Sequence, residues 1–109
     1  MKIKTAKKML NKIIFAEFGL ECIPEYRFHD KRRWRFDFAI VGSNIKNSKI
    51  AIEIEGGIWS GGRHTRGKGF IGDMEKYNTA TAMGWKIIRI QPNDYTSALA
   101  FIKMILENE

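Results

Sequence analysis

Three acidic side chains carry the clearest chemical signal in this sequence. Glu53 and Glu55 alternate with isoleucines, and this period-two pattern is typical of a strand that turns both carboxylates to one face. Asp37 holds a similar place in residues 33–41, where large apolar residues fill the alternate positions. The polar residues 42–48 predict a hairpin, which would bring Asp37 beside Glu53 and Glu55. Such carboxylates suit Mg²⁺, which proteins hold through one or two carboxylates while water and phosphate complete its shell.

A purely structural interpretation competes with this one. An isolated Glu-x-Glu pair such as Glu53 and Glu55 is more often the solvated face of an edge strand. Asp37 reverses this preference, because aspartate is depleted from strands and like charges on one sheet face destabilise it. No lysine is evident on that face to cancel the three charges. We expect the opposite face of residues 33–41 to enter the core through its large apolar residues: Trp34, Phe36, Phe38 and Ile40.

Further polar residues follow the acidic segment and suit phosphodiester hydrolysis. Lys76, three residues after Asp73 in a predicted helix, can stabilise a transition state or lower the pKa of a water molecule. His64 can act as a general acid or base, or bind phosphate when it is protonated. The loop 56–69 is rich in glycine, so its amides can approach phosphates, and it carries three cations: Arg63, Arg66 and Lys68. The competing interpretation is that these loop residues, His64 included, are simply solvated.

A regular succession of elements surrounds these residues. Apolar periodicity predicts helices over residues 5–18, about 72–83 and about 94–106, and alternation predicts strands over residues 22–28, 33–41, 49–55 and 85–90. Gly19 and Gly84 are placed to end the first two helices, and Asn93 or Asp94 to cap the third. The order is therefore α-β-β-β-α-β-α, which predicts an α/β (α+β) fold with a central sheet flanked by helices.

Two charged residues of the first predicted helix differ in their place on its surface. Lys7 falls on the solvated side of the helix by its spacing. Glu17 instead lies in line with the apolar stripe of Leu10, Ile13 and Ile14. It is either an edge residue whose carboxylate reaches water or a carboxylate facing the site, where it would bind or orient Lys76 or a metal-bound water. Both interpretations stay open.

Charge and composition favour a nucleic-acid partner. The 109 residues carry 19 Lys or Arg against 12 Asp or Glu, and the formal charge of +7 favours an anionic partner, nucleic acid before a membrane surface. Arg33 and Arg35, which flank Trp34, suit contact with a nucleic-acid backbone. The single Cys22 excludes an internal disulfide and fits a reducing compartment, and no apolar run reaches membrane-spanning length. We therefore expect one cytoplasmic domain over residues 1–109.

The order of the motifs resembles that of the PD-(D/E)XK nuclease superfamily. The motifs are WRFDFA (34–39), AIEIEGG (51–57), GRHTRGKGF with GDMEKYN (62–78) and GWKIIRI (84–90). Within the superfamily, the likeness is nearest to small endonuclease-domain proteins related to very-short-patch-repair endonucleases. Proteins of this kind are often found in phages and bacterial mobile DNA.

This resemblance implies a restriction-endonuclease-like αβββαβ core, a mixed sheet and DNA cleavage that depends on Mg²⁺, for which Mn²⁺ substitutes. It also implies a set of catalytic residues: Asp37, Glu53 and Glu55 as metal ligands, with Glu17, His64 and a supporting Asp73. Position 55 departs from the superfamily pattern, because it holds glutamate where lysine is expected. Similar departures are rescued by a lysine displaced to the following helix, and Lys76 is the candidate here.

Two other classes of function remain open. One is a non-catalytic nucleic-acid-binding module of the same fold within a larger DNA-processing complex, and the other is a small basic protein that binds a protein partner. The sequence does not distinguish mismatched, branched, site-specific or general duplex substrates. One active site per chain cuts one strand, so a double-strand cut would need either a homodimer or two events.

Overall fold

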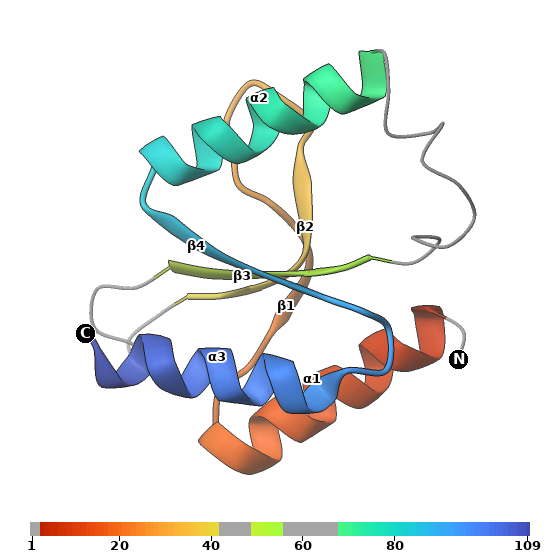
Figure 1. Cartoon of the computed structure of the whole chain (residues 1–109), viewed down its shortest axis with the longest axis vertical. Helices are drawn as coiled ribbons and strands as arrows, with labels where there is room; N and C mark the ends of the chain where they lie inside the picture. Colours follow the sequence, from red (N-terminus) through yellow and green to blue (C-terminus); the bar gives the residue numbers. More distant parts are fainter. Residues whose placement is uncertain (1–2, 42–48, 56–67) are drawn as a thin grey trace.

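The computed structural model describes residues 3–41, 49–55 and 68–109 (Figure 1). The elements in these ranges are α1 (Ile3–Phe18), β1 (Ile23–Arg27), β2 (Arg35–Ile40), β3 (Lys49–Ile54), α2 (Lys68–Ala82), β4 (Trp85–Ile90) and α3 (Tyr95–Glu107). Their order is the predicted one, and Asp94 caps α3 as expected. Helix α2 begins before the predicted residue 72, because the glycines of its first turns disfavour a helix without forbidding it. No described helix is long and apolar enough to cross a membrane.

The four strands form one mixed sheet in the order β1-β2-β3-β4. Strands β1, β2 and β3 are antiparallel neighbours, whereas β4 runs parallel to β3. A parallel pair needs a crossover connection, and α2 lies between β3 and β4 in the chain. Figure 1 shows α2 on one face of the sheet and α1 with α3 on the other. The fold is therefore α+β, with a mixed central sheet between two helical layers.

The main core lies between the sheet and the two helices α1 and α3. Leu10 and Ile14 of α1 and Ile102 of α3 are fully buried there. Strand β3 adds three isoleucines to this cluster: Ile50, Ile52 and Ile54. Between them, Ala51 packs in a second cluster that includes Ala80 of α2. The predicted alternation of this strand is thereby confirmed, and it leaves the side chain of position 53 on the α2 face.

The second cluster, on the face covered by α2, is smaller and aromatic. It contains Phe28 and Phe36, whose stacked rings have centroids 4.2 Å apart, and Trp34 packs against it. Phe38 and Ile40, in contrast, lie in the main core. The prediction that these alternate residues of β2 share one face is therefore wrong. The strand changes face between Phe36 and Phe38.

This change of face falls at Asp37, where the neighbouring strand β1 is distorted. The residue pairs on either side of this position in the register of β1 and β2 place Glu25 opposite Asp37. Glu25 has a φ angle of 49°, a left-handed backbone that residues other than glycine rarely adopt. A left-handed residue interrupts the pleat of a strand, so the side chains on either side of it no longer alternate regularly.

Candidate active site

Asp37 and Glu53 are neighbours at the point where β2 and β3 begin to separate. The described pairing of these strands ends at Phe38 and Ile52, and the next residue of each is one of the two acids. The Asp37 carboxylate fills the opening, because its Oδ2 accepts a hydrogen bond of 2.7 Å from the backbone N–H of Ile54. Two of the three predicted acidic residues therefore come together as the hairpin pattern required.

Glu53 carries the most buried charge in the described part of the chain, with 8 % of the residue exposed. Lys76 of α2 donates a hydrogen bond of 2.9 Å from Nζ to Glu53 Oε1. Burial raises the pKa of Glu53, the bond and charge of Lys76 offset this only in part, and nearby Asp37 raises the pKa further. Lys76 thus reaches the acidic strand from the next helix, and its role in catalysis stays a prediction.

Glu55 is turned toward a different cation, Arg89 of β4. The Arg89 Nε donates a hydrogen bond to Glu55 Oε1, and the strand register places Arg89 beside Glu53. Arg89 and Lys76 also lie over the ring of Tyr77, 5.0 Å and 5.2 Å from its centroid. Burial raises the pKa of Tyr77 far above its ordinary value, and the charge of Glu53 adds to this effect. Glu55 therefore pairs with a guanidinium that lies over an aromatic ring, while Asp37 and Glu53 form the acidic pair.

Lys7 of α1 supplies a cation that the sequence analysis assigned to the solvent. Its Nζ lies 3.0 Å from Asp37 Oδ1 and 3.2 Å from Glu25 Oε1. Burial by itself lowers the pKa of Lys7, but the hydrogen bonds and charges of Asp37 and Glu25 raise it above its ordinary value. The indication in the sequence was a set of acids with no evident lysine beside them, which a cation from another element can balance.

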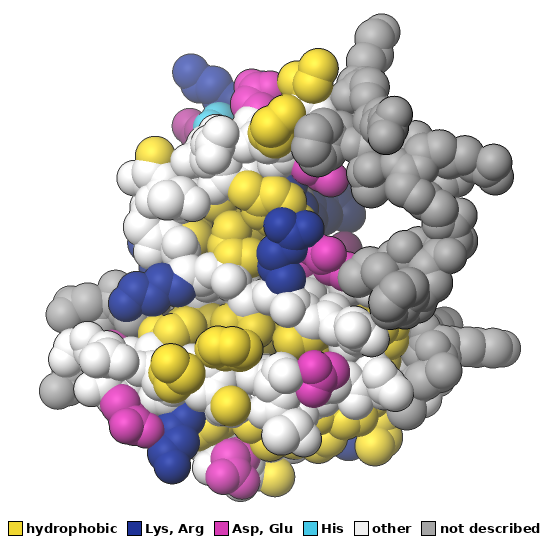
Figure 2. Space-filling model, viewed as in Figure 1, with side chains coloured by type: hydrophobic (Ala, Val, Ile, Leu, Met, Phe, Trp, Pro, Cys, Tyr) yellow, Lys and Arg dark blue, Asp and Glu magenta, His cyan; other side chains and the backbone are white. Residues whose placement is uncertain are grey.

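Together these residues form a row across the sheet. The strand registers place four of them side by side, one on each strand in order: Glu25, Asp37, Glu53 and Arg89. Lys7 reaches this row from α1 and Lys76 from α2, on opposite faces of the sheet (Figure 1). With Glu55 included, four carboxylates meet three cations, which leaves one net negative charge. Figure 2 shows acidic and basic side chains side by side between the helical layers.

The remaining acidic residues predicted for the site lie away from this row. Glu17 is exposed ten residues after Lys7 on α1, about 15 Å along the helix, and pairs with no described cation. Of its two interpretations, the geometry favours the edge residue in water. Asp73 is exposed on α2, and its charge acts on the site by raising the pKa of Tyr77.

The predicted DNA-binding cations are only partly described. Arg33, two residues before β2, and Arg35, its first residue, are exposed, and neither pairs with a described acid. Arg32, between the turn and this strand, pairs with Glu75 of α2 at 2.6 Å and lies over the Trp34 ring. The other predicted contacts fall elsewhere: Arg63, His64 and Arg66 lie outside the described residues, and Lys68 is described only as the first residue of α2.

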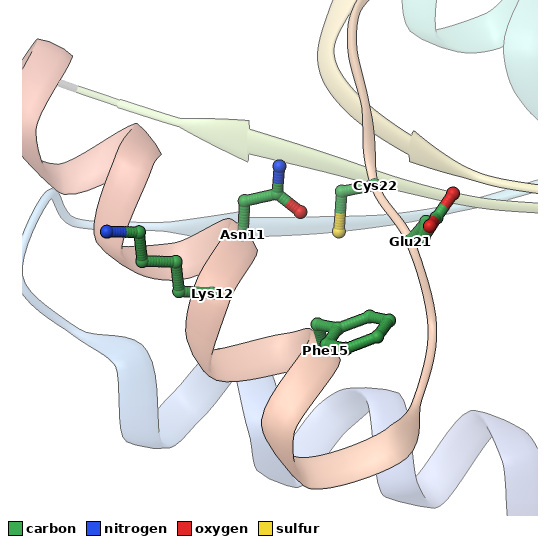
Figure 3. Close-up of a pocket in the computed structure, with 5 residues that line it drawn as sticks. All are labelled: Asn11, Lys12, Phe15, Glu21 and Cys22. Carbon is green, nitrogen blue, oxygen red and sulfur yellow. The ribbon is translucent and has the colours of Figure 1, made fainter.

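A separate hollow of about 420 Å³ lies beside α1 (Figure 3). It is lined by Asn11, Lys12, Phe15, Glu21 and Cys22. Asn11 lies one helical turn after Lys7, so the hollow is on the same face of α1 but farther from the acidic pair. Burial raises the pKa of Cys22 to about 12, which keeps the thiol protonated and unreactive.

The acidic pair fits the ligand set of a magnesium ion. Among the described residues, no group of three or more His, Cys, Asp or Glu side chains is placed to hold a metal. Asp37 and Glu53 supply two carboxylates at one place, which is the number that Mg²⁺ takes from a protein when water and phosphate complete its shell. These two residues would hold the ion, while Glu55 pairs with Arg89 and its predicted role as a third ligand stays a prediction.

In comparisons with known proteins, the chain matches no family model, no curated protein and no solved structure. Its function must therefore be inferred from the side chains and motifs described above.

Proposed function

We propose that this protein is a Mg²⁺-dependent DNA endonuclease that hydrolyses phosphodiester bonds. The observation that carries the proposal is the convergence of Asp37, Glu53 and Lys76 from two strands and a helix. Two carboxylates next to an ammonium group form an unusual cluster at the centre of a sheet, and a strongly basic protein surrounds them. Such a cluster offers a cation site and a positive charge for the same phosphate.

Each member of the cluster has a separate task in this proposal. Asp37 and Glu53 hold the metal, which supplies charge neutralisation at the phosphate and a water of lowered pKa. Lys76 places its ammonium beside Glu53, where it stabilises negative charge that develops on the scissile phosphate. Arg33 and Arg35, exposed just before and at the start of β2, bind the DNA backbone.

We further propose membership of the PD-(D/E)XK superfamily, near the very-short-patch-repair endonucleases. The element order and the mixed sheet are compatible with the restriction-endonuclease-like core that the motifs imply. The contact of Lys76 with Glu53 supports the displaced-lysine variant, because it brings a lysine of the following helix to the acidic strand. Glu55 in this variant serves as the partner of Arg89.

One observation favours a second candidate, the non-catalytic nucleic-acid-binding module. Every carboxylate of the row already has a cation within ion-pair distance: Glu25 and Asp37 have Lys7, Glu53 has Lys76, and Glu55 has Arg89. A fully paired cluster can serve to hold a sheet together without binding a metal. Cleavage assays separate the two candidates.

The test is a cleavage panel on duplex, nicked, mismatched and branched DNA with Mg²⁺, Mn²⁺ or chelator. We expect metal-dependent cleavage by the wild-type protein and a loss of about 100-fold or more in Asp37→Asn and Glu53→Gln. Both variants should still bind DNA, or bind it more tightly, because a negative charge near phosphate is removed. Glu107→Gln, at an exposed position of α3, is the matched control and should cleave like the wild type.

Cleavage at the wild-type rate by both active-site variants would eliminate the proposed site. A wild-type protein that binds DNA but cuts none of these substrates with either metal would point to the binding module. Absent DNA affinity, or affinity that does not change with salt, would point to a protein partner instead.

A further inference from the structure

Lys7 is positioned to compete with any cation that binds Asp37. Its Nζ lies 3.0 Å from Asp37 Oδ1, and Asp37 Oδ2 is engaged by the Ile54 N–H at 2.7 Å. The ammonium therefore occupies the carboxylate oxygen that the backbone leaves available. A divalent cation and an ammonium bound to the same carboxylate repel each other, so Lys7 weakens the binding of a cation at Asp37 in this arrangement.

Glu25 is a second ion-pair partner for Lys7, and the ammonium group hardly has to move to keep it. Its Oε1 lies 3.2 Å from the same Nζ atom, so Lys7 already bridges the two acids. The Glu25 side chain is more than half exposed, at 56 %, whereas that of Asp37 is 19 % exposed. Lys7 can therefore withdraw from the enclosed acid toward the exposed one and keep its ion pair with Glu25.

The backbone of β1 shows that Glu25 is held in this place at a cost. Its φ angle of 49° is unfavourable for a residue with a side chain. Glycine would adopt the same backbone without strain, but it would give Lys7 no carboxylate.

We propose that, before a divalent cation binds, Lys7 holds the place beside Asp37 that the cation takes, and that Glu25 retains Lys7 after the exchange. Lys7 and Glu25 are positioning residues in this scheme. The inference rests on the proposed metal site at Asp37 and Glu53, and it adds that the affinity of the site is set by an exchange between two cations. The ammonium group is also kept within reach of a phosphate that approaches the metal.

The test measures Mn²⁺ binding without DNA, by electron paramagnetic resonance of the free ion and by calorimetry. Removal of the competing ammonium in Lys7→Met should strengthen Mn²⁺ binding roughly tenfold. Glu25→Gln should weaken it by roughly threefold to tenfold, because Lys7 then has no partner when it leaves Asp37. Lys8→Met, the next residue of α1 and exposed, is the matched control and should bind like the wild type.

The double variant Lys7→Met with Glu25→Gln separates an action through Lys7 from direct coordination. If Glu25 acts only by retaining Lys7, Glu25→Gln has no effect once Lys7 is absent. An equal loss of Mn²⁺ affinity in both backgrounds would make Glu25 a metal ligand and would overturn its proposed role. Unchanged or weaker binding by Lys7→Met would overturn the exchange while leaving the metal site intact. If neither the wild type nor Lys7→Met binds Mn²⁺, both the exchange and the proposed function fail.

Discussion

Replacement of Lys76 by methionine should destabilise the fold strongly, because it leaves the Glu53 carboxylate without its cation. The Lys76 side chain is 15 % exposed and that of Glu53 is 11 % exposed, so water can replace little of the lost interaction. Breaking a buried ion pair by removing one partner costs about 3–5 kcal/mol, and the residual exposure places this pair near 3 kcal/mol. In a chain of 109 residues, this loss corresponds to a fall of roughly 10–20 °C in Tm.

The measurement is urea denaturation in the presence of chelator, monitored by tryptophan fluorescence. Lys86→Met provides the control, since Lys86 is exposed on β4 and pairs with no described acid, and its change should stay within about 0.5 kcal/mol. Adding Glu53→Gln to Lys76→Met should recover most of the loss, because the double variant no longer buries a charge. A loss below about 1 kcal/mol for Lys76→Met would show that the pair behaves like a surface ion pair and would refute this account.

Two further predictions concern parts of the fold outside the acidic row. Cys22 should react with iodoacetamide at pH 8.5 roughly a thousandfold more slowly in the native protein than in urea, because burial raises its pKa to about 12. Since the folded-state pKa is the higher one, stability should fall as pH rises above about 8.5, and a Cys22→Ala variant should lose this slope. Asp94→Ala should cost about 1 kcal/mol in urea denaturation, because the Asp94 carboxylate accepts a 3.2 Å hydrogen bond from the Ser97 N–H at the start of α3. Asp94→Asn, which keeps the acceptor, should retain most of the stability.

The sequence was sufficient for the order of elements and for one face of the sheet. The alternation around Glu53 is a local property, and it holds because β3 is flanked on both sides and is regular over its length. The antiparallel pairing of β2 with β3 was also predictable, since these two strands follow each other in the sequence. Asp37 and Glu53 could therefore be brought together from their positions alone.

The sequence was insufficient where partners come from distant elements. Lys7 and Arg89 belong to a helix and a strand whose placement against Asp37 and Glu55 depends on the packed fold, so no spacing rule identifies them. The change of face within β2 was missed for a related reason. It lies opposite the left-handed residue Glu25 of the adjacent strand, and glutamate gives no local indication of such a backbone.

The row of charges across the sheet predicts how two fragments of the chain would behave. Its acids all precede residue 56, whereas Lys76 and Arg89 follow residue 67. A fragment holding only the first three strands would contain Glu53 and Glu55 without either counter-charge, and their mutual repulsion would oppose the hairpin. The two halves should therefore regain the cluster only on reassociation, so a division of the chain between β3 and α2 suits a reporter of their association.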